Sequence, residues 1–415
     1  WLETIGLSFN SGITVQEWIR TARALAFDSL SSAILCSSTD SAALPVCTLR
    51  TDEIVWGRAP ARLDTGGGWT DTPPYALEYG GCVVNAAVDL NGQPPIQAYL
   101  RCTDQQSITI GSIDLGTRIH VTQLDELLDY REPTSQYGLV KAALALSGFS
   151  SKNGTSLADL LRSFGGGLEI TTLAAIPKGS GLGTSSIMGA VILAVIHRAM
   201  GIELTGQELF NKVLQLEQAL TTGGGWQDQI GGVVGGVKII STQPALVPNP
   251  RIHYLPSDAL DPTVNGGTTL LYYTGITRLA KNILEQVVGR YLDRNRRAMA
   301  TLRKIDALTA KVAEALSRKD RSTVGRLVQT AWLLNKQLDP NSTNEQVETL
   351  FERIGPHIEG AKLLGAGGGG FLLMVCKSPT DAQTVHDMLT SHPPNERARF
   401  FEYGINQDGL IVTVC

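Results

Sequence analysis

The segment from Ala174 to Met200, "AAIPKGSGLGTSSIMGAVILAVIHRAM", places the strongest constraint on how this chain can fold. Apolar residues up to Ile176 are typical of a strand, a glycine-rich loop follows, and an apolar helix is expected to begin at about Thr184. A helix N-terminus offers unpaired N–H groups and the positive end of the helix dipole, which together attract anions. Small residues let the loop backbone approach a ligand closely. The segment therefore predicts a phosphate-binding loop.

Two other kinds of nucleotide-binding loop are excluded because their sequence patterns are not present here. A Walker A loop ends in Lys followed by Ser or Thr, and no such pair closes this loop. The dinucleotide fingerprint needs an acidic residue after a second strand, whereas Glu203 follows Gly201 at the end of a helix. A nicotinamide enzyme is therefore disfavoured. On these residues alone, Thr184 could also be the cap of a buried helix.

A second segment, "LEQALTTGGGWQDQIGGVVGG" from Leu216, contains two carboxylates. Glu217 is expected at the end of a helix, and Asp228 lies eleven residues later in a stretch expected to be a glycine-rich loop. Phosphoryl transfer needs oxygen ligands for Mg²⁺, positive charge at the moving phosphoryl group and an acceptor for the attacking hydroxyl. Two carboxylates, a phosphate loop and an arginine supply these parts. The alternative is that Asp228 is a turn residue.

Three charged residues crowd into "PARLDTGGGWTDTPPY", which begins at Pro60. A hairpin would explain the glycines but not the closeness of Arg62, Asp64 and Asp71. For Asp64 the alternative is a strand-end residue that ties the loop to Arg62. A third glycine run, "KLLGAGGGGFLL" from Lys362, lies in a stretch with strand character.

The order of expected elements indicates an α+β protein with two lobes and not a regular βαβ alternation. Over residues 51–245 we expect an N-terminal, ATP-binding lobe with a mixed sheet. Over residues 246–415 we expect a helix-rich α+β lobe. Residues 1–50 are expected to be a lead-in from an upstream domain, with a helix over Thr14–Leu30.

Composition restricts the class of protein. The 415 residues are 43% hydrophobic and 18% charged with a net charge of -4, which suits a large buried core and disfavours nucleic-acid binding. The six cysteines show no CxxC pair and no zinc-like spacing, which favours a reduced, cytoplasmic protein. No apolar run reaches the roughly 20 residues that span a membrane. The chain begins at Trp1 without a signal-peptide pattern, as expected of a part of a longer protein.

The three glycine-rich segments, in this order and spacing, resemble the three motifs of the GHMP kinases, which include galactokinase, homoserine kinase and mevalonate kinase. The resemblance covers about Ile54 to Val414 and implies the two-lobed GHMP kinase fold with ATP and Mg²⁺ as cofactors. The first segment is most similar to the fucokinase group. That similarity implies transfer of phosphate to the anomeric hydroxyl of L-fucose, giving L-fucose 1-phosphate on a salvage route to GDP-fucose.

The resemblance also implies roles for single residues. The second motif of the family wraps the ATP phosphates, and here it comprises Pro177, Gly179, Ser180, Gly181, Leu182, Gly183, Thr184, Ser185 and Ser186. The expected Mg²⁺ ligands are Ser185 and Glu217, although Thr184 and Ser186 leave open which hydroxyl meets the metal. The third motif is expected near substrate and phosphate with Gly365, Gly367, Gly368, Gly369 and Gly370.

On the same resemblance, Asp228 matches the catalytic aspartate of the family and Arg62 the arginine beside the reacting hydroxyl. Arg62 precedes Asp71 by nine residues, as in galactokinases, so Asp71 is expected to bind sugar hydroxyls. Gly68 and Trp69 replace the Glu-His pair of galactokinases, which implies a different sugar and a stacking surface.

Two other functions stay open. A D-glycero-D-manno-heptose 7-phosphate kinase would need a basic pocket for the phosphate of its substrate, with Arg101, Arg131 or Lys141 as candidates. A GHMP-like sugar sensor would bind sugar without turnover. Fucokinase-like kinases are often fused to a GDP-fucose pyrophosphorylase, so such a fusion or partner is expected. The sequence indicates no oligomeric state.

Overall fold

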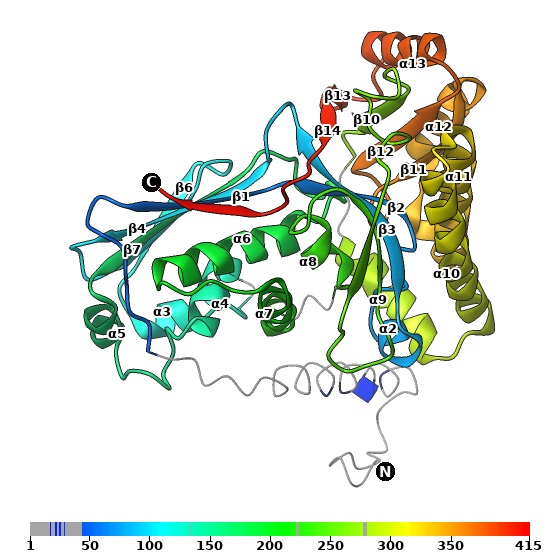
Figure 1. The fold of residues 1–415 in the computed structure, drawn as a ribbon. Coiled ribbons are helices and arrows are strands. Elements are labelled where there is room, and N and C mark those ends of the chain that lie inside the picture. Colours follow the sequence, from blue (N-terminus) through cyan, green and yellow to red (C-terminus); the bar gives the residue numbers. More distant parts are fainter. Residues whose placement is uncertain are drawn as a thin grey trace.

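The computed structural model describes residues 44–132, 134–220, 224–276 and 280–415, together with a few single positions before residue 44 (Figure 1). The helix expected over Thr14–Leu30 lies outside these continuous ranges. Within them, no helix is both long enough and apolar enough to cross a bilayer.

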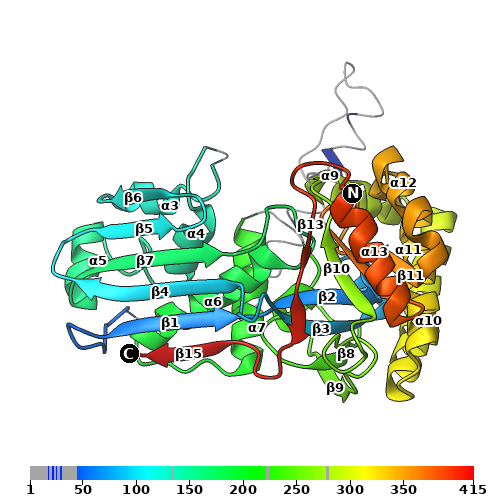
Figure 2. The same ribbon diagram turned by 90° about the horizontal axis from the view of Figure 1, so that it is seen from above.

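A six-stranded mixed sheet forms one end of the molecule, with its strands side by side in Figure 2. Its strands, in spatial order, are β15 (Ile411–Val414), β1 (Ile54–Ala59), β4 (Ile96–Thr103), β7 (Gly167–Ala174), β5 (Ile108–Ser112) and β6 (Thr117–Val121). Strands β5 and β7 pair in parallel, while the other neighbours are antiparallel. The mixed sheet expected of the N-terminal lobe is therefore confirmed.

Helix α6 (Thr184–Ala199) lies against β1 and β4 on one face of this sheet (Figure 1). Most of its residues are buried because the helix is apolar on nearly all sides, as expected of a helix enclosed by a sheet and other helices. Helices α4 (Gly138–Leu146) and α7 (Gly206–Ala219) cover the side of α6 that faces away from the sheet. The N-terminus of α6 points toward the second lobe.

Two more sheets continue the fold. The first contains β2 (Ala61–Gly66), β3 (Cys82–Leu90), β8 (Val237–Ser241), β9 (Arg251–Leu255) and β14 (Tyr403–Ile405). The second has the order β11 (Ile358–Leu363), β12 (Phe371–Cys376), β10 (Thr269–Tyr273) and β13 (Arg399–Phe401). The shorter helices are α2 (Tyr75–Tyr79), α3 (Leu124–Leu128), α5 (Leu157–Phe164) and α8 (Gln227–Gly231).

Long helices cover the second lobe (Figure 1). They are α9 (Ala280–Leu292), α10 (Arg296–Ser317), α11 (Arg321–Leu338), α12 (Glu345–Ile354) and α13 (Pro379–Ser391). Helix α10 packs on β2 and β3, while α11 packs on β11 and β2, so these two helices join the lobes. The helix-rich α+β lobe expected from the sequence is present.

The chain crosses between the lobes more than once. Strand β9 pairs with β8, and the C-terminal strands β14 and β15 return to pair with β3 and β1. Residues after 246 therefore contribute strands to the sheets of the first lobe. The boundary between the two lobes expected at residue 245 therefore stays a prediction.

His197 generates a prediction about acid stability. It is 4% exposed on α6, where its Nδ1–H donates to the Leu193 carbonyl at 2.8 Å, and burial lowers its pKa to about 4. Between pH 6.5 and 4 the unfolded chain protonates this imidazole while the folded chain does not, so the contribution of His197 to stability falls as the pH drops. At about 1.4 kcal/mol per pKa unit, we expect a loss on the order of 2 kcal/mol.

Denaturant titrations of wild type and His197→Gln at pH 7 and pH 4.5 measure the free energy of unfolding, and the difference between the two proteins isolates this loss from the opposite contributions of Asp71 and Glu217, whose pKa values are raised. His197→Gln keeps a hydrogen-bond donor but lacks the titrating ring, so acidification should cost it about 2 kcal/mol less than wild type. The exposed His386 provides a matched control, since His386→Gln should leave that dependence unchanged. Equal slopes for wild type and His197→Gln would contradict the prediction.

Candidate active site

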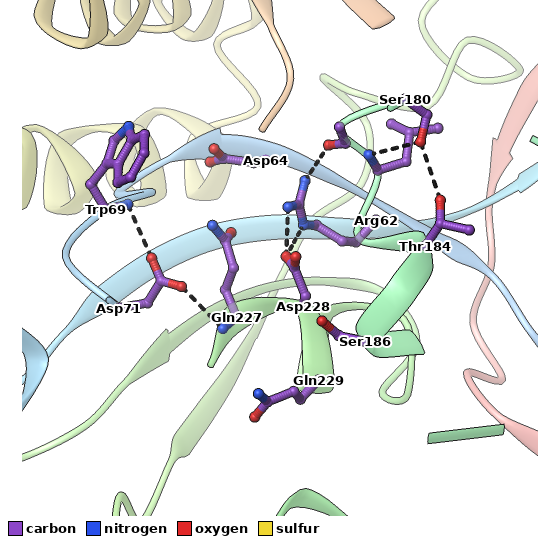
Figure 3. A network of polar contacts seen from close by, with 12 residues as sticks. Arg62, Asp64, Trp69, Asp71, Ser180, Thr184, Ser186, Gln227, Asp228 and Gln229 are labelled. Atoms are coloured by element: carbon purple, nitrogen blue, oxygen red, sulfur yellow. Dashed lines mark hydrogen bonds and ion pairs between the residues drawn. The ribbon is translucent and has the colours of Figure 1, made fainter. Parts of the chain in front are cut away.

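The guanidinium of Arg62 joins three segments that are far apart in sequence (Figure 3). Its Nε donates to Asp228 Oδ1 at 2.6 Å, Nη2 lies 2.5 Å from the same oxygen, and Nη1 donates to the Gly181 carbonyl at 2.7 Å. Burial acts to lower the pKa of Arg62, but the carboxylates of Asp228 and Asp64 outweigh it and raise the pKa. A charged arginine therefore stands between the first motif, the glycine loop and Asp228.

Asp228 does not lie in a loop, so that expectation was wrong. It occupies the first turn of α8, which starts after the buried Trp226. Trp226 and Ile230 pack into a small apolar cluster with residues of β3 and α7, and this packing stabilises a helical turn between two glycine runs. Many glycines lie nearby, and glycine has a low helix propensity, so the local sequence did not predict this helix.

The loop before α6 has the backbone of an anion site. Gly179, Gly181 and Gly183 all have positive φ, at 70°, 76° and 75°, where a residue with a Cβ would be strained. Gly183 is the N-cap of α6, and no side chain of the described residues caps this helix end. Thr184 is therefore not the cap, and the first N–H groups of α6 stay available for an anion.

The third motif supports this loop. The N–H of Phe371 donates to the Ser180 carbonyl at 3.0 Å. A Cβ on Gly181 would lie 2.2 Å from the Leu364 carbonyl oxygen, so the two backbones touch. The run from Gly367 to Gly370 has positive φ throughout, which only glycine adopts readily. The third motif thus lies beside the phosphate loop, and its contact with substrate stays a proposal.

Glu217, at the end of α7, is buried beside the start of α6. Ser186 Oγ donates to Glu217 Oε1, and Gln229 Nε2 donates to Glu217 Oε2 at 2.9 Å. Burial raises the pKa of Glu217 to about 7, and the nearby charge of Asp228 adds to this effect. The hydroxyl that contacts Glu217 belongs to Ser186, while Ser185 is exposed on the same turn.

These oxygen donors fit Mg²⁺, which uses one or two carboxylates together with waters and substrate phosphates. In the described ranges, no group of three His, Cys, Asp or Glu side chains could hold a metal. A site shared with phosphates therefore suits Glu217 better than a site made by the protein alone.

The residues expected to bind the sugar lie in a buried loop. Asp71 is 2% exposed, and its two oxygens accept the N–H groups of Trp69 at 3.0 Å and Gln227 at 3.2 Å. Burial, followed by the charge of Asp228, raises the pKa of Asp71 to about 7. Trp69 has φ of 83° and is only 8% exposed, so its ring belongs to the core in this structure. The stacking role of Trp69 stays a proposal.

Sequence reasoning missed two residues here. Lys362 Nζ donates to Asp64 Oδ2 at 2.6 Å, and both side chains are almost fully buried. Asp64 is therefore tied to β11 of the second lobe and not to Arg62. Gln227 lies between Asp71 and Asp228 (Figure 3). A lysine at the head of the third motif was the available signal, but a separation of 298 residues gave no reason to pair it with Asp64.

Comparisons with known proteins agree with this geometry. The family models of the GHMP kinases match the chain twice, the N-terminal domain at residues 140–236 and the C-terminal domain at residues 312–395. A Bacteroides fragilis protein, L-fucokinase/L-fucose-1-P guanylyltransferase, is 42% identical over 94% of this chain and 41% of its own length. The chain belongs to the GHMP kinase family.

Two further comparisons define the relationship. The bifunctional fucokinase/GDP-fucose pyrophosphorylase of Arabidopsis thaliana is 36% identical over 80% of this chain and 31% of its own length. The chain thus spans less than half of these two relatives. A D-glycero-D-manno-heptose 1-phosphate kinase from Bacteroides thetaiotaomicron has the same fold, with a TM-score of 0.63 at 22% identity over 86% of this chain and 98% of that one.

Gly183 offers a test of the loop geometry. A Cβ at this position would lie 3.2 Å from Arg62 Cγ and from Asp228 Cγ, in addition to the strain of φ at 75°. The strain alone costs roughly 1–2 kcal/mol. Relief of this strain and of the two close contacts would displace the start of α6 from Arg62 and Asp228, so we expect Gly183→Ala to lower turnover with ATP by about one to two orders of magnitude, at about 1.4 kcal/mol of barrier for each factor of ten.

Gly206→Ala is the matched control, because a Cβ there meets nothing within 4 Å and alanine favours a helix. Steady-state kinetics with ATP would compare the two variants. Equal turnover for both would show that the approach of Gly183 to the ion pair has no importance.

Proposed function

We propose that the chain is an ATP-dependent sugar kinase that phosphorylates the anomeric hydroxyl of L-fucose to give L-fucose 1-phosphate. The observation that carries the proposal is the ion pair between the buried Arg62 and the partly exposed Asp228 at the uncapped N-terminus of α6. The choice of L-fucose is supported by the identity of 42% to the Bacteroides fragilis relative over nearly the whole chain. Guanylyl transfer, named for that relative, is not assigned to this chain.

The geometry supports a division of tasks. In this proposal Asp228 accepts or orients the proton of the sugar hydroxyl, and Arg62, which is bonded to the carboxylate, balances negative charge as the phosphoryl group moves. The N–H groups at the start of α6 bind the ATP phosphates. Mg²⁺, held by Glu217 with Ser185, would neutralise phosphate charge, and the bond from Ser186 orients the Glu217 carboxylate.

The nucleotide also finds positive charge beside the loop. A hollow of about 380 Å³ is lined by Pro177 and Lys178 of the loop and by Tyr273, Arg397 and Arg399 of the second lobe. Because it adjoins the phosphate loop and not Asp71, we assign its charge to ATP. A cytoplasmic location fits the supply of ATP and the free cysteines of the described residues.

The three cations considered for the phosphate pocket of a heptose 7-phosphate kinase do not form such a pocket. Arg101 lies 2.5 Å from Glu169, Arg131 donates to the Ala219 carbonyl, and Lys141 donates to Asp129 at 2.7 Å. Each of the three cations has its own partner, so they form no shared phosphate site among the described residues. The sensor alternative is disfavoured because Arg62, Asp228 and Glu217 are all in place.

A substrate panel tests the proposed function. The protein is supplied with ATP and Mg²⁺, and ADP release is measured with L-fucose, D-galactose, D-mannose and heptose 7-phosphate. We expect L-fucose to give the highest kcat/KM, and the product should be an anomeric phosphate by ³¹P NMR. A preference for the heptose phosphate would overturn the proposal, and ADP release with none of these sugars would favour the sensor.

Asp228→Asn separates chemistry from binding. The amide retains the shape of the side chain but cannot accept a proton, so kcat should fall by about two to four orders of magnitude. Affinity for a non-hydrolysable ATP analogue, measured by calorimetry, should change little. The surface change Asp293→Asn serves as a control, and near-normal turnover of Asp228→Asn would remove Asp228 from the mechanism.

A further inference from the structure

Several buried acceptor oxygens near the candidate active site have no hydrogen-bond partner among the described residues, and two of them belong to side chains that lie against Gly68. These two are Asp64 Oδ1 and Gln227 Oε1. Buried polar atoms in folded proteins are nearly always paired, so an unpaired acceptor at a site points to a missing donor. An ionised carboxylate only accepts hydrogen bonds, and a hydroxyl group is a suitable donor.

The side chains of Asp64 and Gln227 meet at Gly68. A Cβ placed on Gly68 would lie 2.6 Å from Asp64 Oδ2 and 3.3 Å from Gln227 Nε2. Because Gly68 has no side chain, it leaves room for the side chains of Asp64 and Gln227 to lie close together. Gly68 belongs to the motif expected on the sugar side. Figure 3 shows Gln227 reaching from Asp71 toward Asp64, past the Arg62–Asp228 pair.

Lys362 holds Asp64 in place and neutralises its charge. The ammonium group donates to Asp64 Oδ2 at 2.6 Å and to the Asp64 backbone carbonyl at 3.2 Å, with exposed fractions of 1% and 2% for the two side chains. A buried carboxylate is stable only when it is paired. Since the ion pair engages Oδ2, the Oδ1 oxygen remains as an acceptor.

Asp64 also lies close to the reacting groups. It follows Arg62 by two residues on β2, so the two side chains share one face of the strand. The negative charge of Asp64 contributes to the raised pKa values of Arg62 and Asp71, which lie on either side of it. The free oxygen of Asp64 therefore belongs to the region between the proposed base Asp228 and Asp71.

We propose that Asp64, held by Lys362, accepts a hydrogen bond from one hydroxyl of the sugar, and that Gln227 Oε1 accepts a second. This inference rests on the proposed function. It makes Asp64 and Gln227 determinants of sugar specificity and Lys362 a positioning residue. A site built to bind a hydroxyl rejects the analogue that lacks it, because the buried acceptor is then left unpaired.

The test combines protein variants with deoxy sugars. Asp64→Asn places an amide where the carboxylate was, and we expect kcat/KM for L-fucose to fall about 100-fold with KM for ATP nearly unchanged. Wild type should lose a similar factor with one of 2-deoxy-, 3-deoxy- or 4-deoxy-L-fucose. With that analogue, the kcat/KM of Asp64→Asn should lie less than about threefold below that of wild type, because the contact is already absent.

Two further variants keep the test decisive. Asp64→Asn combined with Lys362→Met removes both buried charges, and its folding is checked by circular dichroism if the single variant does not fold. Gln227→Met removes the second acceptor at similar volume and should couple to a different hydroxyl. Asp89→Asn is the matched control, since this carboxylate on the neighbouring β3 binds Asn406 and should leave sugar kinetics unchanged.

The outcomes separate this inference from the proposed function. If wild type does not use L-fucose but uses another free sugar, the proposed function fails and the deoxy series of that sugar is tested. If each deoxy penalty is the same in wild type and in the folded variants, neither side chain touches the sugar and the inference is overturned. If no free sugar drives ADP release, both are overturned.

Discussion

The ion pair between Arg62 and Asp228 is the interaction on which the rest of the site depends. It places a buried cation from β2 against the first turn of α8, and the same guanidinium binds the carbonyl of Gly181 in the phosphate loop. Burying a charge is costly unless it is paired and hydrogen-bonded. The pair therefore requires all three segments to be in position, so the geometry of the candidate site is coupled to stable folding.

The glycines surround this pair for a steric reason. Gly183 leaves room for Arg62 and Asp228, and Gly231 leaves room for the stem of Arg62. On the far side, the contact of Gly181 with Leu364 lets the third motif support the loop. The first motif has the same construction, with Gly68 against Asp64. Small residues lie wherever two backbones or a backbone and a charged group must meet.

Much of the fold could be predicted from local patterns. The strand, loop and helix around Thr184 appear where apolar periodicity and glycines placed them, and the segment after residue 246 is rich in helix as expected. The short helix that carries Asp228 could not be predicted, because it is stabilised by the packing of Trp226 and Ile230 and not by propensity. The return of β14 and β15 to the first lobe was also hidden, since strand pairing leaves no local signal.

The sequence by itself determined which chemical groups are present: a glycine-rich loop before a helix, two carboxylates and an arginine in motifs of one family. Tertiary structure alone decided which of them touch. It assigned the hydroxyl of Ser186 to Glu217 and the amine of Lys362 to Asp64. Partners so distant in sequence are selected by the burial of charge and by packing, and both depend on the whole fold. Local sequence gives the identity of each chemical group, but only the packing of the whole fold determines which other group it contacts.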